Sequence, residues 1–357
     1  MNVNTGSGEI LGLLQITWPI IQAPMAGIST PSMAAAVSNA GGLGSLGVGA
    51  MTATAAAASM AAFRELCRAS LNLNVFCHRP ATPNASSEAA WLRRLRPEFE
   101  KVGFEPPVCI SEIYKSFVED DAMLAAIIAA KPRAVSFHFG HPTEAAIRAL
   151  RGAGIVLLGT ATSLHEARIL ESSGVHAVIA QGYEAGGHLG VFDPDAADDQ
   201  IGTLPLTRLL VGNLDVPVIA AGGIMDGAGI ASVLRLGAVA AQLGTAFLAT
   251  DESAADEGYR RALLSDAANH TMMTRAISGR PARCLANRFT SFGAHADSRD
   301  IPPYPIAYAA GKALHAAAKA AGESGYGARW AGQGASLLRP MSTEKLMSTL
   351  IGELSKT

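Results

Sequence analysis

The sequence is poor in charged, aromatic and cysteine residues, and each scarcity excludes a class of protein. Charged residues make up only 16% of the 357 positions, with 28 basic against 30 acidic side chains. No basic run or basic helix face stands out, so nucleic acid is not an expected partner. The four cysteines, Cys67, Cys77, Cys109 and Cys284, form no CxxC pair. This spacing argues against a zinc ribbon or a disulfide scaffold and favours a reducing compartment, the cytoplasm.

Long apolar runs are also missing. No stretch of 18 residues stays apolar without a glycine or a polar interruption, so no membrane span or membrane partner is expected. The first fifteen residues lack the positive and apolar regions of a signal peptide. Hydrophobic residues nevertheless reach 49%, with 37 glycines and only 6% aromatic residues. This composition suits closely packed helices on a sheet, with glycine-rich turns that bind a ligand.

Short apolar runs alternate with helical patterns along most of the chain. In the pattern Ser163–Ser173, Ser163 and Glu166 match a capping box, and Gly174 suits the position just past the helix. The alternation predicts parallel βα units, and eight of them predict an α/β fold of the (β/α)8 TIM-barrel type. The predicted strands are Pro19–Ala26, Gly42–Gly47, Leu71–Phe76, Ala134–Phe139, Ile155–Thr160, Ala177–Gln181, Pro217–Ala221 and Ala238–Leu243.

The regular alternation breaks down in two regions. Residues 251–330 hold helical pieces interrupted by the proline-rich segment IPPYP at 301–305, and they are predicted to form a mostly helical inserted or lid domain. The barrel is then expected to comprise residues 10–250 and 331–357. Residues 80–130 contain several prolines and predict an enlarged connection between two strands.

The most informative segment is GYEAGGHLG at 182–190, which follows the predicted strand ending at Gln181. Glycines let backbone N–H groups approach a ligand closely, and histidine can move protons near neutral pH. The loop therefore predicts a ligand site with His188 as its reactive side chain. A flexible turn with a solvated histidine is the alternative.

Two further turns predict a phosphate site. Gly222 and Gly223 follow the seventh predicted strand, and Gly244 and Thr245 follow the eighth, where TIM barrels commonly bind phosphate. The alternative is that these glycines only make tight turns. The segment QAPMAG at 22–27 offers an apolar surface on which a flat ring could lie, although ordinary core packing accounts for it equally well.

Two other patterns are weaker. Gly42–Gly47 matches GxGxxG, but the segment before it is helical, whereas a dinucleotide fingerprint requires a strand there. NAD binding at this segment is therefore not expected. His138 and His141 lack a third ligand, so no metal is predicted, and His138 fits better as a pocket residue at a strand end.

Together these segments resemble the nitronate monooxygenases of class I, formerly called 2-nitropropane dioxygenases. The resemblance covers nearly the whole chain, and it includes VSFHFG at 135–140, VIAAGGIMDG at 218–227, QLGTAFL at 242–248, SGRPAR at 278–283 and NRF at 287–289. It implies an enzyme that holds FMN without a covalent bond and uses no metal. Such an enzyme oxidises alkyl nitronates with O2 to carbonyl products and nitrite or nitrate. A monomer or a homodimer is expected.

The resemblance also implies roles for individual residues. It places His188 in catalysis, with His138 nearby. Pocket residues that match are Tyr114, Tyr259, Tyr304, Tyr308 and Lys312, which would suit a small carboxylate such as propionate 3-nitronate. The implied FMN contacts are Ala23, Pro24, Met25, Asn74, Gln181, Gly186, Gly187, Gly223, Gln242, Gly244 and Thr245.

Three other functions are alternatives. An NADH:quinone reductase and an FMN-dependent enoyl-acyl carrier protein reductase share the barrel, but the SGRPAR and NRF segments and the tyrosines argue against both. A flavin- or phosphate-binding module without activity is the third, against which the intact His188 argues. The sequence leaves open whether His188 removes a proton from a neutral nitroalkane or stabilises an anion.

Overall fold

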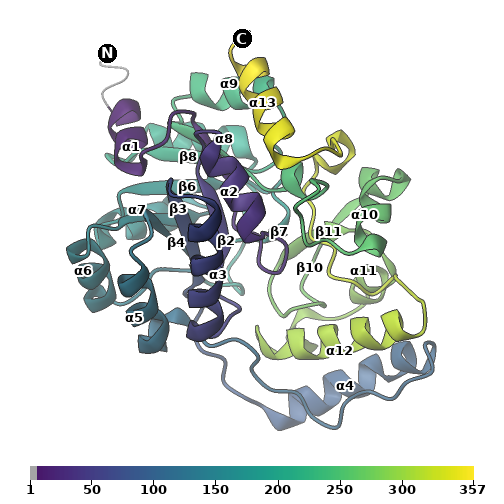
Figure 1. The fold of residues 1–357 in the computed structure, drawn as a ribbon. Coiled ribbons are helices and arrows are strands. Elements are labelled where there is room, and N and C mark those ends of the chain that lie inside the picture. Colours follow the sequence, from purple (N-terminus) through teal and green to yellow (C-terminus); the bar gives the residue numbers. More distant parts are fainter. Residues whose placement is uncertain (1–5) are drawn as a thin grey trace.

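The computed structural model describes residues 6–357 and consists of a barrel with a second layer on one side (Figure 1). The amino-terminal stretch predicted not to be a signal peptide falls partly outside this range, since residues 1–5 are not described. Within residues 6–357, no helix combines the length and the apolar character needed to cross a membrane.

Eight parallel strands form the barrel, in the order β1-β9-β8-β6-β5-β4-β3-β2. The sheet closes through Leu43, whose N–H donates to the Ile20 carbonyl and whose carbonyl accepts from the Gln22 N–H, both at 3.0 Å. The predicted TIM barrel is therefore confirmed. The strands are β1 (Ile20–Gln22), β2 (Gly44–Gly47), β3 (Leu71–Phe76), β4 (Ala134–His138), β5 (Val156–Ala161), β6 (Ala177–Gln181), β8 (Val218–Ala221) and β9 (Ala240–Leu243).

Helices cover the outside of the barrel and close one of its ends. Ile10 and Leu14 of the first helix pack against inward-facing Leu158, Ile179 and Ile219, so the opposite, carboxyl end of the strands is free for a ligand. The helices are α1 (Gly6–Leu14), α2 (Pro31–Asn39), α3 (Ala53–Leu66), α5 (Asp121–Ala130), α6 (Glu144–Gly152), α7 (Leu164–Ser173), α8 (Thr203–Val211), α9 (Gly227–Arg235) and α13 (Thr343–Leu354).

The start of α7 corrects one local prediction. Ser163 caps the helix, because its Oγ accepts from the Glu166 N–H at 3.3 Å, and Gly174 ends it at φ 90°. The predicted capping box is only half formed, because the Glu166 carboxylate accepts from the N–H groups of Thr162 and Phe192 instead. Glu166 thereby ties α7 to the loop that carries His188.

The second layer has its own apolar core. Helix α4 (Ala85–Glu100), from the long β3–β4 connection, lies beside α12 (Ile306–Ala320). Trp91 and Phe99 of α4 are buried in one cluster with Leu314 and Tyr326. The division into a barrel (10–250 and 331–357) and a lid domain (251–330) remains a proposal. Helix α4 lies within the sequence range of the barrel, but it packs against α12 of the lid domain.

The lid domain also contains a β-hairpin that the prediction of a mostly helical domain missed. Its strands, β10 (Thr271–Thr274) and β11 (Ala282–Leu285), pair antiparallel between the helices α10 (Glu257–Leu263) and α11 (Arg288–Gly293). Each strand has only four residues, too few for an alternating pattern to stand out in the sequence.

The glycines of the GxGxxG match serve close packing. A Cβ on Gly44 would lie 2.0 Å from the Ala34 carbonyl oxygen of α2, and a Cβ on Gly42 would lie 2.8 Å from the Ile20 carbonyl oxygen. Helix α2 therefore packs directly on the backbone of β2, which accounts for these glycines without a nucleotide.

We predict that Gly44→Ala destabilises the protein by about 2 kcal/mol or more, because the clash is with backbone that cannot move aside. Gly352→Ala is the matched control, since a Cβ there meets nothing within 4 Å. It lies in α13, where alanine favours the helix, so its effect should stay within about 1 kcal/mol of neutral or be stabilising. Urea unfolding followed by circular dichroism measures both, and equal stability of the two variants would contradict this packing role.

Candidate active site

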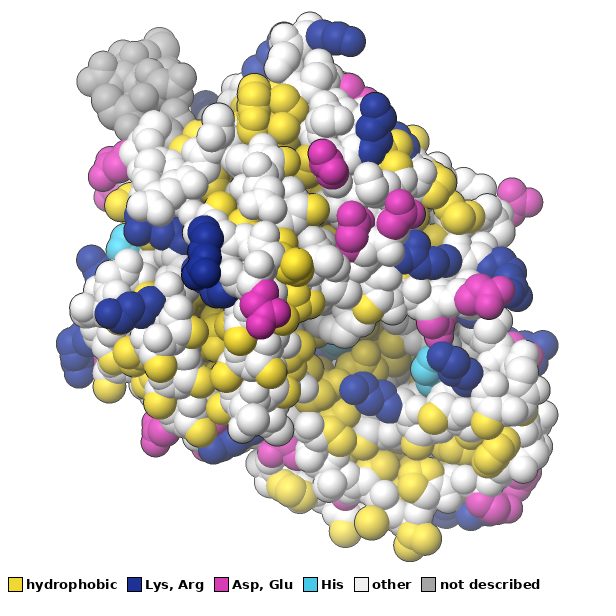
Figure 2. Space-filling view, viewed as in Figure 1, with side chains coloured by type: hydrophobic (Ala, Val, Ile, Leu, Met, Phe, Trp, Pro, Cys, Tyr) yellow, Lys and Arg dark blue, Asp and Glu magenta, His cyan; other side chains and the backbone are white. Residues whose placement is uncertain are grey.

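The carboxyl ends of the barrel strands open into a cavity of about 470 Å³. This volume lies in the range of small-molecule sites, roughly 300–1,000 Å³. Its walls come from the loops after β1, β2, β3, β4, β6, β8 and β9, together with side chains of α12 and Trp330. Figure 2 shows a hollow between the barrel and the α4–α12 layer, with hydrophobic side chains along it.

All of the residues predicted from the sequence to form the site line this one cavity. The lining residues in the described part of the chain include no aspartate or glutamate, whereas they include His138, His188 and Lys312. A cavity with a cation and without a fixed negative charge favours an anionic ligand.

His188 lies where the barrel and the lid domain meet. The two-residue strand β7 (Gly187–His188) pairs antiparallel with β11, placing His188 opposite Ala282 and Gly187 opposite Arg283. Just before β7, Gly186 lets the chain pass close to the backbone of Ala331 and Gly332, since a Cβ there would lie 2.4 Å from the Gly332 N. The sequence-predicted loop is therefore an ordered strand edge, and the alternative of a flexible turn does not hold.

Polar contacts fix both the backbone and the ring of His188. Its carbonyl oxygen accepts from Gln181 Nε2 at 3.1 Å and lies 3.1 Å from His138 Nε2. Because a carbonyl can only accept, His138 carries a proton on Nε2. On the ring of His188, Nε2 lies 2.8 Å from Ser278 Oγ.

Both histidines are neutral at physiological pH. Burial lowers the pKa of His188 to about 3, with smaller contributions from the nearby His138, Arg280 and His78. Burial likewise lowers the pKa of His138 to about 4, against the opposing effect of its bond to the His188 carbonyl. Each ring therefore offers one N–H and one lone pair rather than a positive charge.

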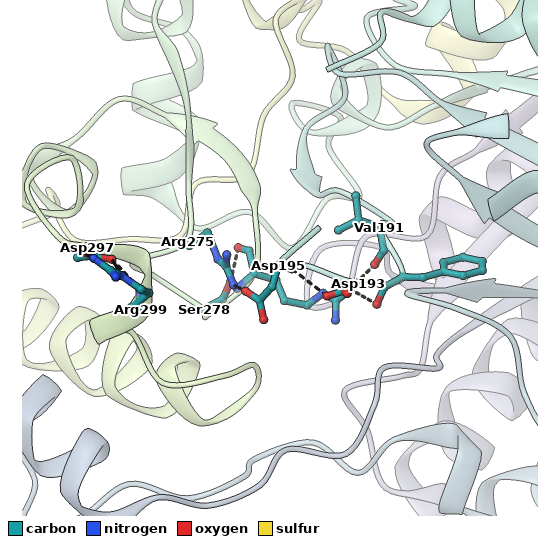
Figure 3. A network of polar contacts seen from close by, with 9 residues as sticks. Val191, Asp193, Asp195, Arg275, Ser278, Asp297 and Arg299 are labelled. Atoms are coloured by element: carbon teal, nitrogen blue, oxygen red, sulfur yellow. Dashed lines mark hydrogen bonds and ion pairs between the residues drawn. The ribbon is translucent and has the colours of Figure 1, made fainter. Parts of the chain in front are cut away.

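The SGRPAR segment holds the His188 loop at both ends. Arg280 is 4% exposed, and its Nη2 donates to the carbonyl oxygens of Val191 and, at 3.3 Å, Phe192. Arg283 donates twice to the Tyr183 carbonyl, at 3.1 and 3.0 Å. Figure 3 shows the first of these contacts, together with the neighbouring ion pair between Arg275 and Asp195 at 2.7 Å.

The turns after β8 and β9 keep free donors at one end of the cavity. Gly223 has φ +68°, and the backbone N–H groups of Gly223 and Gly244 donate to no oxygen of residues 6–357. Free N–H groups at such turns are suited to phosphate. At the same place Gln242 Oε1 is buried without a partner among the described residues, so it can accept a hydrogen bond from a bound ligand. These residues fit a ligand that carries a phosphate and a hydrogen-bond donor.

Three of the predicted tyrosines and Lys312 converge on the wall of the same cavity. The Tyr114 ring lies 6.2 Å from the Tyr304 ring and 6.0 Å from the Tyr308 ring, centroid to centroid. Lys312 Nζ lies 4.8 Å from the centroid of Tyr114 and 5.3 Å from that of Tyr308. Tyr304 and Tyr308 also lie 5.4 and 6.0 Å from the His188 ring, so the cluster borders His188 directly.

Tyr259 does not join this cluster. Its hydroxyl donates to the Trp330 carbonyl, and its ring packs with Leu248 and Ala331. Trp330 itself was not predicted, although its ring lies 5.0 Å from that of His188 and its Nε1 donates to Tyr308 Oη at 3.3 Å. No sequence pattern marks Trp330, since a single tryptophan next to a domain boundary carries no spacing signal.

The HxxH pair gives no sign of a metal. His141 Nδ1 lies 3.0 Å from the Pro142 carbonyl oxygen, whereas His138 bonds the His188 carbonyl. Within residues 6–357, no group of three or more histidine, cysteine or acidic side chains is placed to hold a metal ion.

Several known proteins are similar to this chain along most of its length. The family model described as "Nitronate monooxygenase" matches residues 8–353. A nitronate monooxygenase from Paraburkholderia phytofirmans is 58% identical over 100% of this chain and 98% of its own length. A crystal structure of a nitroalkane oxidase from Streptomyces ansochromogenes is 40% identical, with a TM-score of 0.89 over 97% of this chain and 98% of that one.

A more distant likeness concerns FabK from Thermotoga maritima, whose structure is 27% identical and gives a TM-score of 0.73 over 99% of this chain and 97% of that chain. The family match over most of the sequence and the 58% identity favour the nitronate monooxygenases over FabK. This chain belongs to the nitronate monooxygenase family.

Proposed function

We propose that the cavity holds FMN without a covalent bond and oxidises small alkyl nitronates with O2 to carbonyl products and nitrite or nitrate. Propionate 3-nitronate is the proposed preferred substrate. The observation that carries this proposal is that a neutral, half-buried His188 lines one cavity together with the phosphate-type turns and the tyrosine–lysine cluster.

The residues that would hold FMN are those at the barrel end of the cavity. Ala23, Pro24 and Met25 supply an apolar surface for a flat ring, and Gln242 supplies a buried acceptor. The free N–H groups at Gly223 and Gly244 suit the phosphate. The further proposed contacts are Asn74, Gln181, Gly186, Gly187 and Thr245. The chemistry that FMN supplies when bound is the transfer of electrons from nitronate to O2.

The protein's own part is to bind and orient an anion. A nitronate is already deprotonated, so the site needs hydrogen-bond donors and positive charge more than a base. Lys312 supplies the cation, and Tyr114, Tyr304 and Tyr308 supply hydroxyl groups around it. Propionate 3-nitronate carries a carboxylate as a second anionic group, which suits Lys312 at one end and His188 at the other.

The phosphate site predicts a preference among flavins. Apoprotein should bind FMN at least about tenfold more tightly than riboflavin, because only FMN satisfies the donors at Gly223 and Gly244. Quenching of flavin fluorescence in a titration measures both affinities. Equal affinities would show that these turns do not bind phosphate. Tighter binding of FAD than of FMN would identify FAD as the cofactor instead.

His188→Asn should bind FMN normally but lower kcat/KM for propionate 3-nitronate by about 10²-fold or more, because the ring that faces the anion is lost. Since the pKa of His188 is about 3, we expect no loss of wild-type kcat/KM from its protonation between pH 8 and pH 5. Oxygen consumption measures both the kcat/KM of the variant and the pH dependence of the wild-type kcat/KM.

Unchanged rates in His188→Asn would remove His188 from the mechanism. Wild-type protein that leaves nitronate untouched but bleaches its flavin rapidly with NADH under anaerobic conditions would instead be a reductase.

Lys312→Met tests the carboxylate. KM for propionate 3-nitronate should rise about tenfold with little change in kcat, whereas ethyl nitronate, which has no carboxylate, should be much less affected. Lys319→Met is the matched control on the same helix, because Lys319 pairs with Asp256 at 2.9 Å and does not line the cavity. Equal effects of Lys312→Met on both substrates would contradict a carboxylate site.

A further inference from the structure

Among residues 6–357, Ser278 is the group that shares a hydrogen bond with the ring of His188. Its side chain is fully buried, at 0% exposure, and its Oγ lies 2.8 Å from His188 Nε2. No hydrogen bond within residues 6–357 involves the other ring nitrogen, Nδ1. Because His188 lines the cavity, Nδ1 is the nitrogen left for a bound ligand.

The Ser278 hydroxyl could face His188 in either of two ways, since a hydroxyl both donates and accepts. It could donate to Nε2, which places the ring proton on Nδ1. It could instead accept from Nε2–H, which leaves a lone pair on Nδ1. The choice decides whether His188 offers a donor or a base to the substrate.

The surroundings of Ser278 favour the first arrangement. The Arg280 N–H donates to Ser278 Oγ at 3.4 Å, so a chain of bonds can run in one direction, from Arg280 to Ser278 to His188. In the second arrangement both neighbours donate to Ser278. Its own proton could then reach only the carbonyl oxygen of Arg280, at 3.3 Å. An anion in a cavity without acidic side chains further favours an N–H that points toward it.

We propose that Ser278 is a positioning residue that donates to His188 Nε2 and fixes the His188 ring with its proton on Nδ1, facing the substrate. This inference deepens the proposed function, on which its kinetic part rests. His188 then acts as a hydrogen-bond donor to the nitronate, and the enzyme discriminates against neutral nitroalkanes because Nδ1 has no lone pair to take their proton.

The ring proton can be located directly by ¹⁵N NMR of FMN-loaded, full-length protein labelled in histidine, with His188→Asn to assign the signals. At pH 7 we expect Nδ1 to be protonated and Nε2 to be unprotonated. A proton on Nε2 would overturn the proposal whatever the kinetics show. This readout needs no turnover, so it separates a failure here from a failure of the proposed function, which would appear as wild-type protein inactive on nitronates.

Ser278→Ala supplies the second test. Without the hydroxyl, the Nε2–H form should gain population in the NMR spectrum. The ratio of kcat/KM for ethyl nitronate to that for nitroethane should fall about tenfold. Ser70→Ala is the matched control, because Ser70 is a buried serine that donates to the Leu14 carbonyl at 2.6 Å, away from the cavity. An unchanged proton position and ratio in Ser278→Ala, or equal changes in Ser70→Ala, would overturn the role of Ser278.

Discussion

The main-chain pairing of β7 with β11 is the contact on which the site depends. It joins a barrel loop to a hairpin of the lid domain and sets the position of the His188 backbone. The His188 carbonyl then becomes the shared acceptor of Gln181 and His138, and the ring reaches Ser278. None of these three contacts could form if the strand edge moved by a few ångström, because hydrogen bonds weaken steeply with distance and angle.

Burial shapes the chemistry of the site as much as geometry does. His188 and His138 stay neutral because partial burial in the cavity wall disfavours their charged forms, and the buried Arg280 nearby disfavours a further positive charge. Arg280 is itself buried, with its guanidinium carbon 4.4 Å from the centroid of Phe139 and donor contacts to two backbone carbonyls. This buried positive charge near the histidines favours an anion in the cavity.

The barrel could be predicted from the sequence because its strands are buried on both faces and appear as short apolar runs. The ends of the strands were predicted less accurately. Strand β1 ends at Gln22, four residues before the predicted end, because Pro24 has no N–H to donate to the sheet. The hairpin β10–β11 and the residue Trp330 were missed because neither has a periodic signal. The glycine-rich turns and His188 were identified because glycines at a strand end let the backbone approach a ligand closely.

Tyr259 and Ser278 show the limit of such predictions. Tyr259 lines the cavity as predicted, but its hydroxyl is used by the Trp330 carbonyl, which only the folded chain reveals. Ser278 stood in the sequence as one letter of a family motif, and its contact with His188 spans 90 residues. Long-range partners of this kind depend on tertiary packing rather than on local sequence.

The shared sheet β10–β11–β7 also has a consequence for how this protein could change over evolution or by engineering. A lid domain that merely rested on the barrel could be exchanged for another as a module. Here the exchange would remove the strand partner of His188 and both arginines that hold its loop. Residues 251–330 and the His188 loop therefore form one heritable unit, and the side chains that line the cavity can be altered one by one, whereas this segment cannot be replaced without losing the support of His188.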